Sequence, residues 1–270
     1  MQKKSLRIFI FLGFLIGSIT VKAQPEPQKP VLPNTKKESR DNQKKTILKS
    51  LVENMVYIEG GTFTMGATSE QGSDYNNAKP IHQVTLSSFF IGKYEVTQEE
   101  WEAVMGNNPS RSKGSKLPVE AVSWNDCRKF IHKLNQLTGK KFRMLTEAEW
   151  EYAARGGKRS KGYMYSGGDS IDNVAWYMDN SSNKLHEVGQ KTPNELGLYD
   201  MSGNVSEWCN DRYDEYNKSH QTNPKGPSSG STRIERGGSG LGATIWCRVS
   251  IRGSHWPSER YYGLGLRLAF

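Results

Sequence analysis

The residues of this chain best suited to chemistry lie in one short segment, residues 197–209, which combines carboxylates with turn-forming residues. Asp200 and Glu207 offer hard carboxylate oxygens, while Gly203 and Asn204 let the backbone turn so that main-chain carbonyls can join them. Oxygen ligands in a flexible geometry are what Ca²⁺ takes. The same residues also fit a Gly-Asn turn between two strands with solvated acids. Spacing alone does not separate these two interpretations.

The cysteines and histidines set a second limit on the chemistry. The chain has three cysteines, Cys127, Cys209 and Cys247. In an exported chain, three cysteines indicate one disulfide and one remaining thiol. The five histidines are scattered, without the His-x-x-x-His spacing of a zinc or iron site. We therefore interpret them as surface or core-edge residues.

Residues 1–23 have the features of a cleaved secretory signal peptide. Three basic residues precede an apolar stretch over residues 8–19, and a small residue, Ala23, follows as a cleavage site. The apolar stretch is short for a membrane span, although an uncleaved anchor is the alternative. We expect an exported protein that is periplasmic, on the outer surface or secreted, with no stable membrane span after signal cleavage.

Residues 24–50 are rich in Pro, Lys, Gln and Asn and are predicted to form a flexible basic tether, because they can bury little apolar surface. The formal net charge of +9 includes four cations from residues 1–23. No basic stretch is interleaved with aromatic residues, so we expect no nucleic-acid partner. Residues 51–270 are long enough for one domain with its own core.

The pattern within residues 51–270 predicts an α+β fold with few strands, about three short helices and much irregular loop. Strands are expected over residues 55–65 and, as a pair, over residues 84–94. Capping boxes at Thr97, Ser123 and Thr146 predict helices that end near residues 105, 137 and 154. Turn residues dominate from residue 157 onward. Bound ions are one way to satisfy the backbone of such irregular chain.

Nine ordered motifs are spread over residues 54–270, at 55–66, 94–97, 117–119, 122–124, 143–155, 197–209, 236–239, 247–252 and 265–268. Together they resemble the formylglycine-generating enzyme family, also called the sulfatase-modifying-factor domain, whose fold is related to C-type lectins. The resemblance implies that fold for residues 51–270. It does not by itself imply the activity.

The resemblance also implies calcium as a cofactor, at two sites. The first site matches Asp200, Gly203, Val205 and Glu207. The second matches Asn173 and Val174, followed less closely by Asn180 and Ser182, because the loop differs in length.

The family's oxidases bind Cu(I) with two cysteines, separated by four residues, just after Gly-Gly-Ser; thiolates suit this soft ion. Here Cys247 occupies the second position, but Gly242 occupies the first. Ser206 also replaces a Trp that flanks the family's active pocket. Ser239 and Glu95 are retained near that pocket, and with Cys247 they are the catalytic candidates if the protein is active. With half of the cysteine pair missing, we do not expect copper.

The same resemblance suggests how the cysteines pair. The segments that contain Cys209 and Cys247 lie close together in the family fold, which favours a disulfide between them. Cys127, within a predicted helix, would then be a buried free thiol. A disulfide would leave Cys247 unable to act as a nucleophile or a metal ligand.

The C-terminal part of the chain is rich in Trp, Tyr and Arg, the side chains that most often dominate binding interfaces. The candidate ligand surface consists of Trp246, Arg248, Arg252, His255, Trp256, Tyr261 and Tyr262. The alternative is that these side chains pack an irregular core.

These observations favour a non-catalytic binding or scaffolding module at the cell envelope. Related domains occur in gliding-motility and secretion machineries, so the expected partner is a cell-envelope or exported protein, or a glycan. The first alternative is a formylglycine-generating oxidase that acts on a cysteine of sulfatase-type substrates. The second is a calcium-dependent carbohydrate-binding module.

Overall fold

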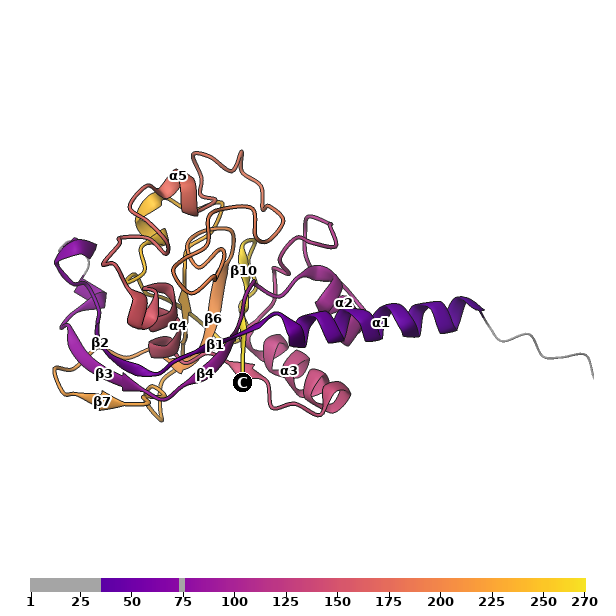
Figure 1. Cartoon of the computed structure of the whole chain (residues 1–270), viewed down its shortest axis with the longest axis horizontal. Coiled ribbons are helices and arrows are strands. Elements are labelled where there is room, and N and C mark those ends of the chain that lie inside the picture. Colours follow the sequence, from indigo (N-terminus) through magenta and orange to yellow (C-terminus); the bar gives the residue numbers. More distant parts are fainter. Residues whose placement is uncertain (1–34, 73–75) are drawn as a thin grey trace, which may run out of the picture.

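The computed structural model of the chain describes residues 35–72 and 76–270. The predicted signal peptide, residues 1–23, and the first part of the predicted tether therefore lie outside the described residues. In the described part, helices α1, α2 and α3 lie at one end of the molecule and the three-stranded sheet at the other, with long loops between them (Figure 1). None of the helices in this part is long and apolar enough to cross a membrane.

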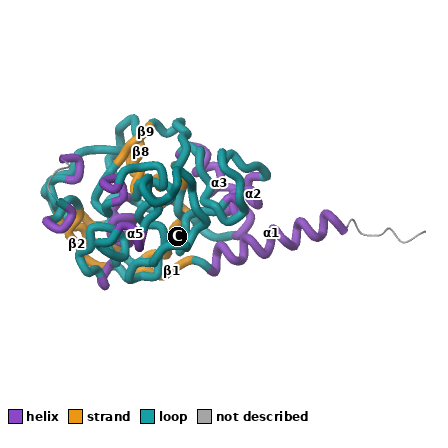
Figure 2. Tube along the Cα trace, turned by 90° about the horizontal axis from the view of Figure 1, so that it is seen from above, coloured by secondary structure: helices purple, strands orange, loops and turns teal. Residues whose placement is uncertain are grey.

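A helix, α1 (Thr35–Glu53), stands where the sequence predicts part of a flexible tether. It projects from the rest of the molecule, as two perpendicular views show (Figures 1 and 2). The segment contains no Gly or Pro and is rich in good helix formers such as Lys, Arg, Gln and Leu. Only its last turns reach the core, where Leu51 is buried and Leu48 and Val52 are partly buried. The structure therefore has a helix over residues 35–53, where the sequence predicts flexible chain up to residue 50.

Two sheets contain the first strands of the domain, and the four-stranded one also contains its last strand. The four-stranded sheet has the order β1-β4-β11-β5 and is antiparallel. Its strands are β1 (Met55–Ile58), β4 (Phe89–Gly92), β11 (Leu268–Ala269) and β5 (Arg143–Met144). The three-stranded sheet consists of β2 (Gly61–Met65), β3 (His82–Leu86) and β7 (Gln221–Thr222). Each of the predicted ranges, residues 55–65 and 84–94, thus contains two strands that belong to different sheets, and β1 pairs with β4 while β2 pairs with β3.

The third sheet carries the candidate site. Its order is β10-β6-β8-β9, and its strands are β10 (Leu264–Gly265), β6 (Ser206–Arg212), β8 (Arg233–Arg236) and β9 (Gly253–His255). Strand β6 pairs in parallel with β10 and antiparallel with β8. This sheet therefore brings residues 197–209, the central segment, next to the Gly-Gly-Ser motif that follows β8.

The three predicted helices are confirmed, as α2 (Gln98–Met105), α3 (Trp124–Thr138) and α4 (Glu147–Ala154). Each begins with a complete capping box, in which the N-cap hydroxyl and the third residue's carboxylate satisfy backbone N–H groups. The remaining helical segments are single turns: α5 (Ile171–Val174), η1 (Ser69–Gln71), η2 (Asn76–Ala78), η3 (Gly157–Arg159) and η4 (Thr244–Cys247).

Two large hydrophobic clusters fill the interior, and aromatic residues supply much of both. One surrounds α4 and includes Trp150. The other lies between α2, α3 and the ends of the domain, where Trp101 and Phe130 stack at 4.8 Å between ring centroids. Trp208 of β6 donates a 2.9 Å hydrogen bond to the carbonyl of Val122 and so fixes the central strand against the α3 side. The core thus holds β6 firmly on both faces.

Candidate functional site

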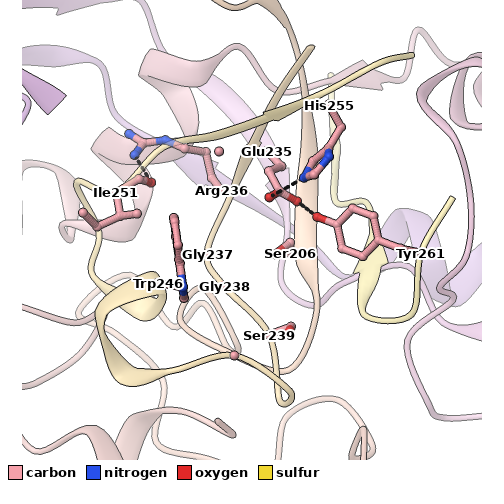
Figure 3. A pocket seen from close by; sticks show the side chains of 12 residues that line it. Ser206, Glu235, Arg236, Gly237, Gly238, Ser239, Trp246, Ile251, His255 and Tyr261 are labelled. Carbon is pink, nitrogen blue, oxygen red and sulfur yellow. Dashed lines mark hydrogen bonds and ion pairs between the residues drawn. The ribbon is translucent and has the colours of Figure 1, made fainter. Parts of the chain in front are cut away.

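A cavity of about 390 Å³ opens where β8 and β9 meet the loop that follows β8 and η4 (Figure 3). Its wall combines small, acidic and aromatic residues. They are Ser206, Glu235, Arg236, Gly237, Gly238, Ser239, Gly242, Trp246, Ile251, Gly253, His255 and Tyr261. Its volume is at the lower end of the range typical of ligand pockets.

The Gly-Gly pair shapes this pocket. Gly237 and Gly238 both have positive φ, at 98° and 69°, a region that favours glycine. A Cβ on Gly238 would lie 2.7 Å from the backbone of Trp246. The close approach lets η4 pack directly on the end of β8, which places the Trp246 indole beside the cavity.

A hydrogen-bonded acidic group forms one side of the pocket, with the Trp246 ring across from it (Figure 3). Glu235 of β8 accepts a hydrogen bond from the Tyr261 hydroxyl and lies 3.1 Å from His255 Nε2. The other ring nitrogen, Nδ1, lies 2.9 Å from Glu259. A carboxylate can only accept, so both nitrogens must carry hydrogen and the ring is a cation.

The protonation states of this group follow from its contacts. The hydrogen bond to Glu235 raises the pKa of His255, and the charges of Glu235 and Glu259 raise it further against the effect of burial. Burial, and then the charge of Glu235, raise the pKa of Tyr261. At neutral pH, Tyr261 therefore keeps its proton and donates it in a hydrogen bond. The Glu235 carboxylate in the pocket wall thus has two donors, the Tyr261 hydroxyl and His255 Nε2.

Arginines beside the pocket are neutralised inside the protein. Arg236 is fully buried and donates to Glu151 and, at 2.5 Å, to the carbonyl of Ile251. Arg252 is only 2% exposed and forms a two-pronged ion pair with Glu147 at 2.6 and 2.8 Å. Both guanidinium groups are therefore paired with buried acids, and that of Arg236 also lines the pocket.

The central segment forms a separate buried cluster of charges behind the pocket. Glu207 accepts hydrogen bonds of 2.7 to 3.1 Å from Arg267 and one of 2.8 Å from Trp150. Glu95 accepts from the side chain of Asn204 at 2.7 Å and from the backbone N–H of Val205 at 2.9 Å. Both carboxylates thus tie the segment to other parts of the chain.

Asp200 supplies the third carboxylate of this cluster. Its backbone has a positive φ of 58°, and its Oδ2 accepts a 2.7 Å hydrogen bond from the N–H of Gly189. Its Oδ1 is buried without a hydrogen-bond partner among the described residues. Burial raises the pKa of Asp200 to about 6. Burial, followed by the charges of Asp200 and Glu207, also raises the pKa of Glu95 well above its usual value.

The predicted first calcium site fits these residues in part. Three carboxylates face one arginine, Arg267, so a divalent cation would offset surplus negative charge, and the unpartnered oxygen of Asp200 is a suitable ligand. Both oxygens of Glu207, however, already accept hydrogen bonds. Across the described ranges, no group of three or more His, Cys, Asp or Glu side chains converges on a point. The fit therefore depends on backbone carbonyls such as those of Gly203 and Val205.

The residues predicted for the second calcium site lie around one loop after α5. Asn180 uses its side-chain oxygen to accept from the N–H of Tyr177 at 2.9 Å, and its amide group donates to the carbonyl of Ala175 at 3.0 Å. Asn173 and Ser182 are exposed, whereas Val174 is buried. The Asn180 side chain therefore closes this loop through hydrogen bonds of its own.

Comparison with known proteins places this geometry in a family. The profile described as the sulfatase-modifying factor enzyme 1-like domain matches residues 40–270. The chain belongs to this family. It is 34% identical to the chaperone protein LppX of Paenibacillus barcinonensis over 251 residues, which cover 74% of this chain and 83% of that protein. It is 29% identical to the formylglycine-generating enzyme of Streptomyces coelicolor over 283 residues, covering 79% and 88%.

Solved structures agree with the fold predicted from the sequence. Treponema denticola variable protein 1 is similar with a TM-score of 0.74 and 35% identity, covering 80% of this chain and 94% of that one. PvdO from Pseudomonas aeruginosa is similar with a TM-score of 0.67 and 28% identity, covering 80% and 93%. The α+β, formylglycine-generating-enzyme-like fold is thus confirmed.

Within this sulfatase-modifying-factor domain, the cysteines depart from the prediction. All three lie in the described part of the chain and are free and buried, so the predicted disulfide between Cys209 and Cys247 is not formed. The physical reason is that Cys209 packs in the cluster around α4, while Cys247 packs with Tyr165 and Val174 in a separate one. Burial raises the pKa of Cys247 to about 12. Cys127 is a buried free thiol of α3, as predicted.

The other catalytic candidates separate in the structure. Ser239 lines the pocket, and its Oγ accepts from the N–H of Leu241 at 3.3 Å. Glu95 lies away from it, in the buried cluster of the central segment. Cys247 does not line the pocket, whereas Gly242 does, and a Cβ there would meet no atom closer than 3.5 Å. A Cβ at the position of the missing cysteine would therefore contact Ser239 at ordinary van der Waals distance without a clash.

Four residues of the predicted ligand surface lie at or beside the pocket. Trp246, His255 and Tyr261 line the pocket, and Trp256 is exposed beside His255 in the chain. The remaining three have structural contacts: Arg252 with Glu147, Arg248 with the carbonyl of Gln71, and Tyr262 with Ser112 and Arg111.

Sequence reasoning missed Glu235, whose carboxylate joins the residues of the acidic side of the pocket. It directly precedes the Arg-Gly-Gly-Ser motif on β8, opposite Gly253 of β9. Only the pairing of β8 with β9 shows that Glu235 faces His255, which lies twenty positions further along the chain.

Proposed function

We propose that this chain is an exported, non-catalytic binding module that holds a cell-envelope or exported protein in the pocket between Trp246 and Glu235. The observation that carries the proposal is the wall of that pocket, where Gly242 replaces a thiol and Cys247 is buried away from the cavity. A fully buried thiol with a pKa of about 12 is not a thiolate at neutral pH. Copper-dependent oxygen activation therefore lacks its ligand pair here.

The names of two relatives support a binding role. One protein with 34% identity is called a chaperone and one with 35% identity a variable protein. The pocket itself has the features of a recognition site, because a half-exposed Trp flanks a cavity with fixed polar groups. Export to the envelope agrees with the secretory signal that the sequence predicts.

The first test compares the mature chain with a variant whose pocket is filled, Gly242→Leu. Each is immobilised and exposed to the envelope and secreted fractions of the source cells, and retained proteins are identified by mass spectrometry. We expect a protein that the natural chain retains and Gly242→Leu loses, while Lys140→Leu, an exposed change at the end of α3, retains it. Equal retention of that protein by the natural chain and by Gly242→Leu would refute the pocket as the binding site.

The same samples test the alternative of an oxidase. Cu(I) is titrated against a competing chelator, and oxygen uptake is followed with a cysteine-containing sulfatase-type peptide. We expect neither tight copper binding nor peptide-dependent uptake. Turnover with the peptide would replace the binding role with the catalytic one.

We also propose that one calcium ion supports the central segment, with Asp200 and Glu207 as carboxylate ligands. The unpartnered Oδ1 of Asp200 and the surplus of buried carboxylates support this. An ion bound only by the folded state stabilises it by about 2.7 kcal/mol at a hundred times its dissociation constant. We therefore expect Ca²⁺, but not Mg²⁺, to raise the melting temperature of the natural chain and not of Asp200→Asn. Equal melting temperatures of the natural chain in Ca²⁺ and in chelator would exclude the ion.

A further inference from the structure

The acidic side of the pocket indicates the chemical class of its ligand. We propose that the pocket receives a lysine or arginine side chain of the partner protein, with Glu235 as its counter-ion and Trp246 along its methylene groups. This inference rests on the proposed function, because it specifies the ligand of the same pocket.

The charges of the pocket wall and of the residues paired with them sum to an excess of one negative charge. Glu235 of the wall and Glu259 each face one nitrogen of the His255 ring, and the His255 cation offsets one of these two carboxylates. The other charged residue of the wall, Arg236, is fully buried and already pairs with Glu151. A cation entering the cavity therefore meets a group with one negative charge in excess, whereas an anion would be repelled.

Glu235 has room for another donor. One oxygen faces His255 Nε2 and the other accepts from the Tyr261 hydroxyl. Each carboxylate oxygen has two lone pairs, so one acceptor position on each remains. An ammonium group can use one of these positions and a guanidinium can use both.

The opposite wall suits the stem of such a side chain. Trp246 is 42% exposed and lines the same cavity. Lys and Arg stems pack on aromatic surfaces while their charged ends reach polar groups, and a cation near an indole face gains further attraction. A purely apolar ligand fits less well, because it would displace water from the Glu235 carboxylate without donating a hydrogen bond in its place.

The experiment uses the whole mature chain and four blocked tripeptides that differ only at the central residue: lysine, arginine, norleucine and glutamate. Binding is followed by NMR through the indole N–H signal of Trp246, with free butylamine as a fifth probe. We expect the lysine and arginine peptides to bind at least about tenfold more tightly than the norleucine peptide. The glutamate peptide should not bind. Butylamine should bind more weakly than the lysine peptide, and equal affinity would point to a free amine instead of a protein side chain.

Glu235→Gln keeps the shape of the wall and removes its charge, so it should weaken lysine binding by about tenfold or more. Glu59→Gln removes the charge of an exposed residue outside the pocket wall and is the matched control, with an expected loss below about threefold. Because Glu235→Gln could also disturb folding, its thermal melt is compared first, and Trp246→Leu supplies an independent pocket variant with an expected loss of several-fold.

The outcomes separate this inference from the proposed function. If norleucine and lysine peptides bind equally, or no peptide binds, the cationic ligand is refuted. If Gly242→Leu abolishes capture of the partner and Glu235→Gln does not, the pocket is the binding site but its ligand is not cationic. If Gly242→Leu leaves capture intact, the proposed function itself fails.

Discussion

Replacing Glu207 by glutamine should destabilise the domain strongly, because it removes the charge from a fully buried ion pair. Glu207 accepts three contacts of 2.7, 2.9 and 3.1 Å from Arg267 and one of 2.8 Å from Trp150. Arg267 also donates to the carbonyls of Gly92 at 3.0 Å and Tyr199 at 2.8 Å. Arg267 thereby joins the central strand to β4 and to the start of the central segment. Glutamine keeps the size of the side chain but removes the carboxylate that pairs directly with the guanidinium.

The expected cost follows from this burial. Removing one partner of a buried ion pair typically costs about 3–5 kcal/mol. In a domain of about this size, each kcal/mol corresponds to about 2–4 °C in melting temperature. We therefore expect Glu207→Gln to lower the melting temperature by about 6–20 °C. The double variant with Glu207→Leu and Arg267→Met removes both charges and should lose less than the single variant, because it leaves no guanidinium buried without its ion-pair partner.

Urea unfolding followed by tryptophan fluorescence measures these differences. The control is Glu59→Gln, which breaks the exposed pair with Lys158 and should cost less than about 1 kcal/mol. The whole series is run with calcium and with chelator, since Glu207 is also a proposed calcium ligand. A loss for Glu207→Gln no larger than for Glu59→Gln would refute the view that this pair holds the central segment.

Three further predictions concern the pocket and the thiols. Its partners raise the folded-state pKa of His255, so its stabilising contribution should be complete below the unfolded value of about 6.5 and be lost as pH rises through the folded pKa. His255→Gln should remove that part of the stability curve in urea titrations at a series of pH values, and an unchanged curve would contradict the assignment. Gly242→Cys should fold normally, because its Cβ would meet no atom closer than 3.5 Å. It should bind Cu(I) no more tightly than a single thiol does, because Cys247 is buried. Tight Cu(I) binding in a chelator competition would show that Cys247 can reach the pocket. Ellman's reagent should detect none of the three thiols in the native protein and all of them after denaturation, whereas a single reactive thiol in denaturant would indicate a disulfide.

Local signals in the sequence predicted the local parts of the fold. Thr97, Ser123 and Thr146 each stand three residues before a carboxylate, and each begins a helix with both capping hydrogen bonds formed. The two strands on either side of residues 87–88 are also present, but they belong to different sheets. The sequence prediction missed helix α1, because the polar composition of this segment is typical of flexible chain. The packing of Leu51, which holds the end of the helix, is visible only in the structure.

The site residues were harder to predict, because their partners are distant in the chain. Arg252 was expected on a ligand surface, but it pairs with Glu147, 105 positions away. Glu95 was expected beside the pocket, but it holds Asn204, 109 positions away. Neither side chain type nor spacing distinguishes an arginine that binds a ligand from one that neutralises a buried acid. Only the tertiary arrangement does, which is also why Glu235 was missed.

The family motifs of this chain are explained by backbone geometry and buried charge without any reference to catalysis. Gly238 is required because a Cβ would collide with the backbone of Trp246, and Asn204 has a positive φ of 59° while its side chain binds Glu95. Retention of these residues therefore follows from folding alone. The positions that can change without loss of the framework are those on the pocket wall, such as Gly242, where a side chain has room. Differences in function between proteins with this framework should accordingly be sought in the pocket wall, and in this chain that wall contains an acid, an imidazolium and an indole where the oxidase needs a pair of thiols.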